Sequence, residues 1–395
     1  MTDSEQLEAL FDRCQSEAEA AFGIADVYVE AFTAKARHVE VQIIGDEHGA
    51  VSNLGERECS AQRRNQKLVE IAPAPALDSG LRDRMIDAAT TLAKQEGYQS
   101  LGTFEFLVNS SATGPEFVFI EANARLQVEH TVTEAVTGFD LVQSQIQVAM
   151  GASLASLGLD KPAIPRGFAV QARVNMETLN ADGSVWPGSG TLSAYQPPSG
   201  PGVRVDGFGY VGYETSTAFD SLLAKVIVAH NAPDFSAVCA KTVRALSEFR
   251  IEGVNTNIDF LMNVVDHADF KEGVIHTRWV DLNMAPLAEP SEARQRYVSM
   301  QPATAEGGFA GAKVDTSDPL ALFAHDAEVK SRKETAVEAA PAVVGPNGSN
   351  PVSSPIQGTI VSIDVAVGDE VRAGQQLAVV EAVSYTHLTL PTSSQ

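Results

Sequence analysis

Cysteine is scarce in the 395-residue sequence: only Cys14, Cys59 and Cys239 occur, far apart and odd in number. They form no Cys-x-x-Cys pair, so they suggest neither a disulfide framework nor a zinc ribbon, and favour buried free thiols in a reducing cytosol. No apolar run reaches the ~18 residues that cross a bilayer. The first residues have neither the basic region nor the apolar stretch of a signal peptide. We therefore expect a cytoplasmic protein with no membrane partner.

Basic residues are also few: 28 Lys and Arg face 51 Asp and Glu, which gives a formal net charge of −23. This average charge repels a phosphate backbone, so the sequence predicts no nucleic-acid partner. Hydrophobic residues make up 44 % of the chain, which excludes disorder throughout. At roughly 150 residues a domain, the length predicts two or three domains.

Hydrophobic periodicity and capping residues predict the elements along the chain. In the first part they are a helix within residues 1–30, a strand over 27–44, a helix over 81–96 capped by Asp78, strands over 103–108 and 116–121, and a helix over 141–150 capped by Asp140. From residue 168 short strands and Gly/Pro turns dominate, with a strand over 223–229 and a helix over 238–249. The composition of residues 336–350 predicts a flexible linker, followed by a small β module with strands at 358–363, 367–371 and 376–380.

The two strands over 103–108 and 116–121 form the most informative pattern. Opposite residues of an antiparallel pair have a constant index sum, so a turn near residue 113 places Glu105 opposite Glu121 on the same face. Two carboxylates ~4 Å apart repel by roughly 4 kcal/mol at an effective dielectric of 20, unless one is protonated or a cation lies between them. The hairpin therefore predicts a paired-carboxylate site.

Polar residues then alternate with apolar ones, and in an extended chain all of them share one face. They are Glu121, Asn123, Arg125, Gln127 and Glu129. Carboxylate and amide oxygens suit Mg²⁺, and the planar fork of Arg125 suits a small oxyanion. A solvated strand face alternates in the same way, but the apolar run 117–120 just before Glu121 favours buried surroundings.

Two further patterns carry less information. Arg57, Arg63, Arg64 and Lys67 concentrate positive charge, which suits a polyphosphate, a carboxylate network or simply an exposed charged turn. Residues 207–212 match Gly-x-Gly-x-x-Gly, but no helix pattern follows and no βαβ unit surrounds them. We therefore exclude a dinucleotide-binding motif there and expect these glycines to make turns.

Several long motifs resemble biotin carboxylase, the ATP-grasp component of biotin-dependent acyl-CoA, pyruvate and urea carboxylases. They are residues 37–42, 56–67, 72–75, 102–106, 119–130, 172–175 and 219–225, within a resemblance that covers about residues 5–282. The fold implied is α/β (α+β): an ATP-grasp domain with an antiparallel sheet, then a β-rich biotin carboxylase C-terminal domain. The implied boundaries are a lid remnant at 1–32, the ATP-grasp domain at 33–165 and the C-terminal domain at 166–285.

The resemblance implies ATP- and bicarbonate-dependent carboxylation of biotin through carboxyphosphate. By motif position, Glu105, Glu121 and Asn123 correspond to ligands of Mg²⁺ (or Mn²⁺). The implied bicarbonate clamp is Arg125, Gln127 and Val128, with Glu129 as the base and Arg173 as the residue that stabilises the biotin enolate. The implied nucleotide contacts are Glu30, His38, Gln62, Asn65, Lys67 and Leu107. Phosphoryl transfer mainly requires positioning and charge neutralisation, which these residue types supply.

The C-terminal residues resemble a biotinyl carrier domain. The match covers 353–382, after a linker at 286–352, and it stops before the lysine that carries biotin. Ser384 occupies that lysine's position, and a serine hydroxyl cannot form the biotin amide. We therefore expect residues 383–395 to be a non-native tail.

The sequence departs from the family in two further respects. The family's N-terminal domain and most of its ATP lid lie before the point matched by Met1, and Asn65 stands where many relatives have His. We therefore expect an N- and C-terminally truncated fragment, inactive in isolation, of an acyl-CoA carboxylase of the acetyl- or propionyl-CoA type that acts in fatty acid metabolism. Its expected partners are a biotinylated carrier, a carboxyltransferase and a second copy in a homodimer. The alternatives are another ATP-grasp ligase of the carbamoyl-phosphate synthase type and a non-catalytic scaffold.

Overall fold

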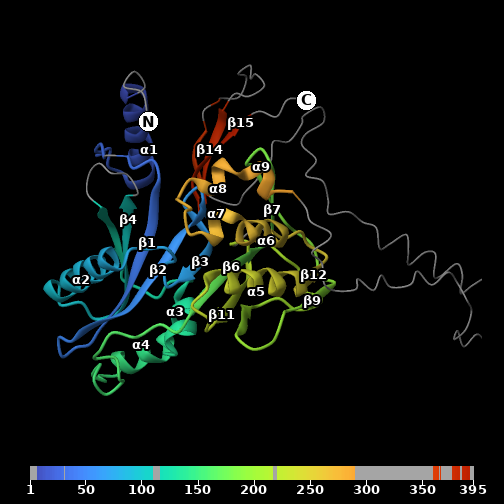
Figure 1. Ribbon diagram of the computed structural model, residues 1–395. Coiled ribbons are helices and arrows are strands. Elements are labelled where there is room, and N and C mark those ends of the chain that lie inside the picture. The colour runs from blue at the N-terminus through green and yellow to red at the C-terminus, as the bar shows by residue number, and fades with distance from the viewer. Residues whose placement is uncertain are drawn as a thin grey trace, which may run out of the picture. The chain divides into compact units, whose positions relative to one another are not determined.

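The computed structural model describes residues 7–30, 32–109, 116–216 and 220–289, and, near the C-terminus, 359–363, 365, 376–382 and 385–391 (Figure 1). The chain divides into two compact units, and the described residues up to 289 all belong to the first. The predicted linker at 336–350, the strand expected at 367–371 and Ser384 lie outside the described residues.

One eight-stranded sheet organises residues 36–230, and every neighbouring pair in it is antiparallel, as expected. Its order is β10 (Val203–Gly207), β11 (Leu222–His230), β6 (Phe168–Asn175), β3 (Gln66–Ala72), β2 (Val51–Arg63), β1 (Ala36–Gly45), β4 (Ser100–Asn109) and β5 (Phe117–Asn123). Because β6 pairs with β3, one sheet contains strands from both sides of residue 166, where the C-terminal domain was expected to begin. Strands far apart in the sequence therefore contribute side chains to one surface.

Helix α2 (Ser79–Gln95) packs on β1 and β2. Val39, Val41 and Ile43 of β1 share one apolar cluster with this helix. Asp78 caps the helix as predicted, because its carboxylate accepts a hydrogen bond of 2.9 Å from the backbone N–H of Leu81. The expected start of β1 at residue 27 is wrong: the strand begins at Ala36, since the preceding residues pair with no strand of the described structure.

The C-terminal part of the sheet is covered on one face by α5 (Phe235–Glu248) and α6 (Ile258–Asp266), which share the largest apolar cluster with β3, β6 and β11 (Figure 1). The other face carries α3 (His130–Thr137). The remaining helices are α1 (Leu7–Phe22), α4 (Leu141–Ala149), α7 (Ala268–Lys271), α8 (Trp279–Leu282) and α9 (Met284–Leu287). Asp140 caps α4, as predicted, through the N–H of Gln143 at 2.7 Å.

Short strands complete the described chain. β7 (Glu177–Leu179) pairs with β8 (Val185–Pro187), and β9 (Ala194–Gln196) pairs with β12 (Arg250–Glu252). A separate sheet contains β13 (Thr359–Ile363), β14 (Gln376–Ala382) and β15 (Tyr385–Pro391) in that order. The first two were expected, whereas no strand was expected at 385–391. Among the described helices, none combines the length and the apolar character required to span a membrane.

The Gly-x-Gly-x-x-Gly segment adopts no helical structure. β10 ends at Gly207 and a turn follows at residues 211–212. A Cβ at Gly207 would lie 2.4 Å from the Tyr195 hydroxyl, and one at Gly209 would lie 2.5 Å from the Tyr195 ring. Close packing on Tyr195, as well as turn formation, therefore requires glycine here.

Candidate active site

The β4–β5 hairpin places the two predicted carboxylates opposite each other. Glu105 pairs with Glu121 and Thr103 with Asn123, and the register shifts by one residue only after Glu105. The Asn123 amide donates hydrogen bonds to Glu105 at 2.8 Å and to Glu121 at 2.9 Å. The hairpin prediction is therefore confirmed in register and in the shared face.

The polar residues after Asn123 do not continue the strand. β5 ends at Asn123, where the backbone N–H of Arg125 donates a hydrogen bond of 2.8 Å to the Asn123 carbonyl. Glu129 directly precedes α3. The chain is therefore extended only as far as Asn123, because local turns satisfy the backbone beyond it. The alternating side chains nevertheless line the same cleft.

This cleft has a volume of about 830 Å³ and collects every site residue expected from the sequence. They are Glu30, His38, Gln62, Asn65, Lys67, Glu105, Leu107, Glu121, Asn123, Arg125, Gln127, Val128, Glu129 and Arg173. They come from β1 to β6, from the turn before α3 and from the segment before β1. Their convergence is a structural finding, whereas the role of each residue remains a prediction.

Lys67 is the electrostatic centre of the cleft. Its ammonium donates to Glu40 at 2.6 Å and to Glu129 at 2.5 Å, and lies 3.5 Å from Glu105. Burial lowers the pKa of Lys67, but the surrounding carboxylates outweigh burial and raise it above its ordinary value. Lys67 is therefore a permanent cation among three carboxylates.

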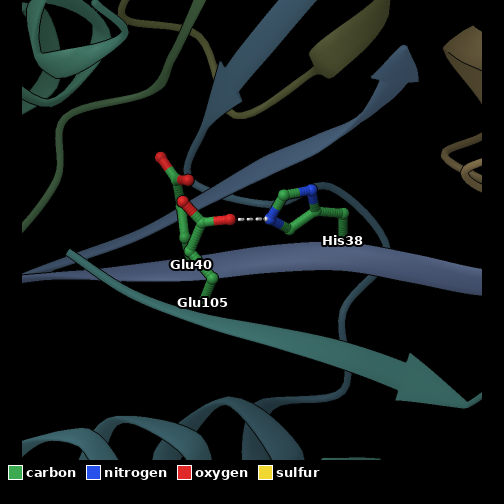
Figure 2. A group of neighbouring side chains, drawn as sticks. All are labelled: His38, Glu40 and Glu105. Carbon is green, nitrogen blue, oxygen red and sulfur yellow. Dashed lines mark hydrogen bonds and ion pairs between the residues drawn. The ribbon is translucent and has the colours of Figure 1, made fainter. Parts of the chain in front are cut away.

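His38 lies beside the metal-ligand candidates (Figure 2). Its Nε2 is 2.7 Å from Oε2 of Glu105, and Glu40 completes a close group. Burial raises the pKa of Glu105, but the His38 hydrogen bond and the Lys67 charge outweigh it and lower the pKa to about 2. Glu105 is therefore ionised and available to a cation at neutral pH.

The sequence reasoning missed Glu40. Its side chain is fully buried between Arg57 and Lys67, and Arg57 Nε donates to it at 2.5 Å. The alternation of His38, Glu40 and Gln42 along β1 could have revealed it. Arg57 also donates to Gln42, Thr103 and Thr133. Of the alternatives for the basic cluster, the carboxylate network is thus the one found for Arg57 and Lys67.

A second missed residue is Glu70, also fully buried, which accepts a hydrogen bond from Arg173 Nε at 2.5 Å. The only signal in the sequence is a single acid between the apolar residues Val69 and Ile71 of a strand. Arg173 also donates to Glu129 at 3.1 Å. The predicted base and the predicted enolate-stabilising cation are thus in direct contact.

The donor set suits a hard divalent cation. Glu105, Glu121 and the amide of Asn123 offer oxygen ligands, and rotation of the amide would present its oxygen in place of its nitrogen. The buried Oε1 of Gln127 has no hydrogen-bond partner among the described residues, which leaves an acceptor free in the cleft. Cys59 lies near Glu40 and Glu129, but burial raises the pKa of its thiol well above the ordinary value, so thiolate ligation is disfavoured. These residues fit Mg²⁺ better than a soft metal.

Comparison with known proteins bears on this site. Residues 1–157 match the family described as "Carbamoyl-phosphate synthase L chain, ATP binding domain", and residues 171–282 match the biotin carboxylase C-terminal domain. The chain therefore combines an ATP-grasp domain with a biotin carboxylase C-terminal domain. The ATP-grasp fold and the β-rich second domain expected from the sequence are thereby confirmed.

The biotin carboxylase region is similar to several characterised proteins. Pyruvate carboxylase 1 of Caenorhabditis elegans is 46% identical over 280 residues, 70% of this chain and 23% of that protein. The biotin carboxylase domain of Hydrogenobacter thermophilus 2-oxoglutarate carboxylase, solved as a dimer with MgADP and bicarbonate, is 36% identical with a TM-score of 0.66 over 73% of this chain and 61% of that one. The chain thus spans about a quarter of the length of the Caenorhabditis elegans pyruvate carboxylase.

One solved structure extends the similarity beyond the biotin carboxylase region. A single-chain, multi-domain long-chain acyl-CoA carboxylase is 37% identical with a TM-score of 0.63, and the match covers 99% of this chain and 35% of that one.

Proposed function

We propose that this chain contributes the biotin carboxylase half-reaction of a biotin-dependent carboxylase: ATP-dependent transfer of CO₂ from bicarbonate to biotin. The observation that carries the proposal is the single cleft that gathers all the predicted contacts to nucleotide, metal, bicarbonate and biotin. Hard-cation ligands, anion-binding side chains and a carboxylate base are what ATP-driven activation of bicarbonate requires.

In this proposal Glu129 takes the proton from bicarbonate, whose oxygen then attacks the γ-phosphate of ATP, so that the bond to ADP breaks and carboxyphosphate forms. Glu129 is buried and contacts both Lys67 and Arg173, so two cations fix its carboxylate. Arg125, Gln127 and Val128 hold the bicarbonate, and the free acceptor of Gln127 supports this role. Arg173 stabilises the enolate of biotin, since its charge cannot be lost by deprotonation.

Glu105, Glu121 and Asn123 would hold Mg²⁺, which when bound neutralises charge on the phosphates of ATP. Lys67 supplies a second positive charge at the same end of the cleft. The nucleotide contacts are His38, Gln62, Asn65, Leu107 and Glu30. MgADP and bicarbonate in the related 2-oxoglutarate carboxylase domain support these assignments.

For the complete enzyme we favour an acyl-CoA carboxylase acting in the cytoplasm. The long-chain acyl-CoA carboxylase supports this choice, because the match to it covers 99% of the chain, whereas the pyruvate carboxylase matches 70%. The biotinylated carrier, the carboxyltransferase and a homodimer belong to the same proposal. Pyruvate carboxylation is the second candidate, favoured by the curated relatives.

Phosphate release from MgATP tests the proposal in the full-length protein that contains this chain. We expect release that requires bicarbonate and rises with biotin. An ATP-grasp ligase of the carbamoyl-phosphate synthase type would respond to an amine donor instead, and a scaffold would cleave no ATP. Adding acetyl-CoA, a long-chain acyl-CoA or pyruvate as acceptor distinguishes the two candidate enzymes.

A further inference from the structure

Glu70 is a fully buried carboxylate in the middle of the sheet to which the proposed reaction assigns no role. Its neighbours Val69 and Ile71 belong to the apolar cluster under α5 and α6, so Glu70 points to the opposite face, towards α3. Burying a carboxylate is unfavourable unless it is paired and hydrogen-bonded, and buried ion pairs are weak evidence for stability. A role in orienting a neighbour would explain its presence.

Both oxygens of Glu70 are engaged. Oε1 accepts from Arg173 Nε at 2.5 Å and also pairs with Nη2 of the same guanidinium. Oε2 accepts from the Gln171 side chain at 2.9 Å, and the Thr131 hydroxyl of α3 donates to that same amide. Glu70 and Gln171 face each other in register across β3 and β6. Arg173 is therefore anchored through a continuous chain of hydrogen bonds to α3.

Arg173 is shared between two carboxylates. Its Nη2 also reaches Glu129 at 3.1 Å, while Nη1 donates no hydrogen bond to any residue that the structure describes. Burial raises the pKa of Glu70 and Arg173 opposes this rise, so the Glu70 anion depends on Arg173. Without Glu70, Glu129 would be the main counter-ion of Arg173 and would draw the guanidinium towards itself.

We propose that Glu70 is a positioning residue whose buried carboxylate holds the Arg173 guanidinium away from full pairing with Glu129, so that it stays available to the biotin enolate. This inference rests on the proposed function. It separates the two chemical steps: during ATP cleavage Lys67 still holds Glu129, so this step depends less on the orientation of Arg173, whereas carboxylation of biotin requires that orientation.

The experiment compares Glu70→Gln, Glu70→Asp and the control Glu56→Gln in the full-length protein. Glu56 is also a buried acid paired with an arginine, Arg82 at 2.6 Å, but on the α2 side of the sheet. We expect E70Q to lower kcat of biotin-dependent ATP cleavage about 100-fold, the scale of a 1 Å misplacement. Biotin-independent cleavage should fall much less than biotin-dependent cleavage, because Lys67 still holds Glu129 in the variant. E70D, which keeps the charge but shortens the side chain, should lose only about tenfold.

Equal losses of biotin-dependent and biotin-independent cleavage in E70Q, matched by E56Q, would assign Glu70 a structural role and overturn the proposal. Full turnover in E70Q would do the same. If E70Q does not fold, E70D decides: a selective loss of biotin-dependent turnover supports the proposal, and wild-type turnover contradicts it. Absence of biotin-dependent cleavage in the wild-type protein would instead overturn the proposed function itself.

Discussion

Arg57 and Glu40 form an ion pair in which both side chains are fully buried, with Nε and Oε1 2.5 Å apart. The second oxygen of Glu40 holds Lys67 at 2.6 Å, and Lys67 in turn reaches Glu129. The pair therefore fixes the position of Lys67, the cation that contacts the predicted base Glu129. Its loss should affect stability and the site together.

Glu40→Gln should destabilise the fold in a pH-dependent way. Burial raises the pKa of Glu40, but Arg57 and Lys67 outweigh it and lower the pKa from 4.5 to about 2. A depressed folded-state pKa contributes stability that is present above the unfolded value of 4.5 and lost as pH falls towards 2. At pH 7 the contribution is about 3 kcal/mol. Urea unfolding of both proteins at pH 7 and pH 3 measures it.

The gap in unfolding free energy between wild type and E40Q should shrink as the pH falls below 4.5. The matched control is Glu116→Gln, which removes an exposed pair with Arg84 and should change stability little at any pH. A gap of constant size between pH 7 and pH 3 would contradict the assigned ionisation of Glu40.

Glu105→Gln and Glu121→Gln should each weaken metal binding. Each removes one hard anionic ligand from the hairpin, so we expect the apparent dissociation constant for Mn²⁺, measured by electron paramagnetic resonance with ADP present, to rise roughly tenfold or more. Glu116→Gln on the same hairpin serves as the control. Unchanged Mn²⁺ affinity in both variants would place the metal elsewhere.

Asp78→Ala should lower stability through α2 alone. The carboxylate caps the N-terminus by accepting from the Leu81 N–H at 2.9 Å, a contact worth about 1 kcal/mol. Thermal unfolding should detect the loss, while Asp87→Ala on the exposed middle of the same helix should not destabilise. Equal effects of the two substitutions would show that the cap contributes nothing specific.

Capping residues and residue spacing predicted the features that depend on neighbouring residues in the sequence. The caps Asp78 and Asp140 and the register of Glu105 with Glu121 follow from spacing within a few residues or across one turn. The side chains that alternate after Glu121 line one cleft, although the chain turns after Asn123.

Glu70 could not be assigned in the same way. Its partner Arg173 lies 103 residues away, on a strand whose place in the sheet no local pattern specifies. The false start of β1 has a related cause, since residues 27–35 alternate like a strand but find no strand to pair with in the described structure.

The most direct test of the account is phosphate release from MgATP by the full-length protein, measured with and without bicarbonate and biotin. We predict release that needs bicarbonate and increases with biotin, and a fall of about 100-fold or more in Glu129→Gln, because general-base catalysis contributes about 10²–10⁴-fold. ATP cleavage that is indifferent to both substrates, or a fully active E129Q, would contradict the assignment of this cleft as a biotin carboxylase site.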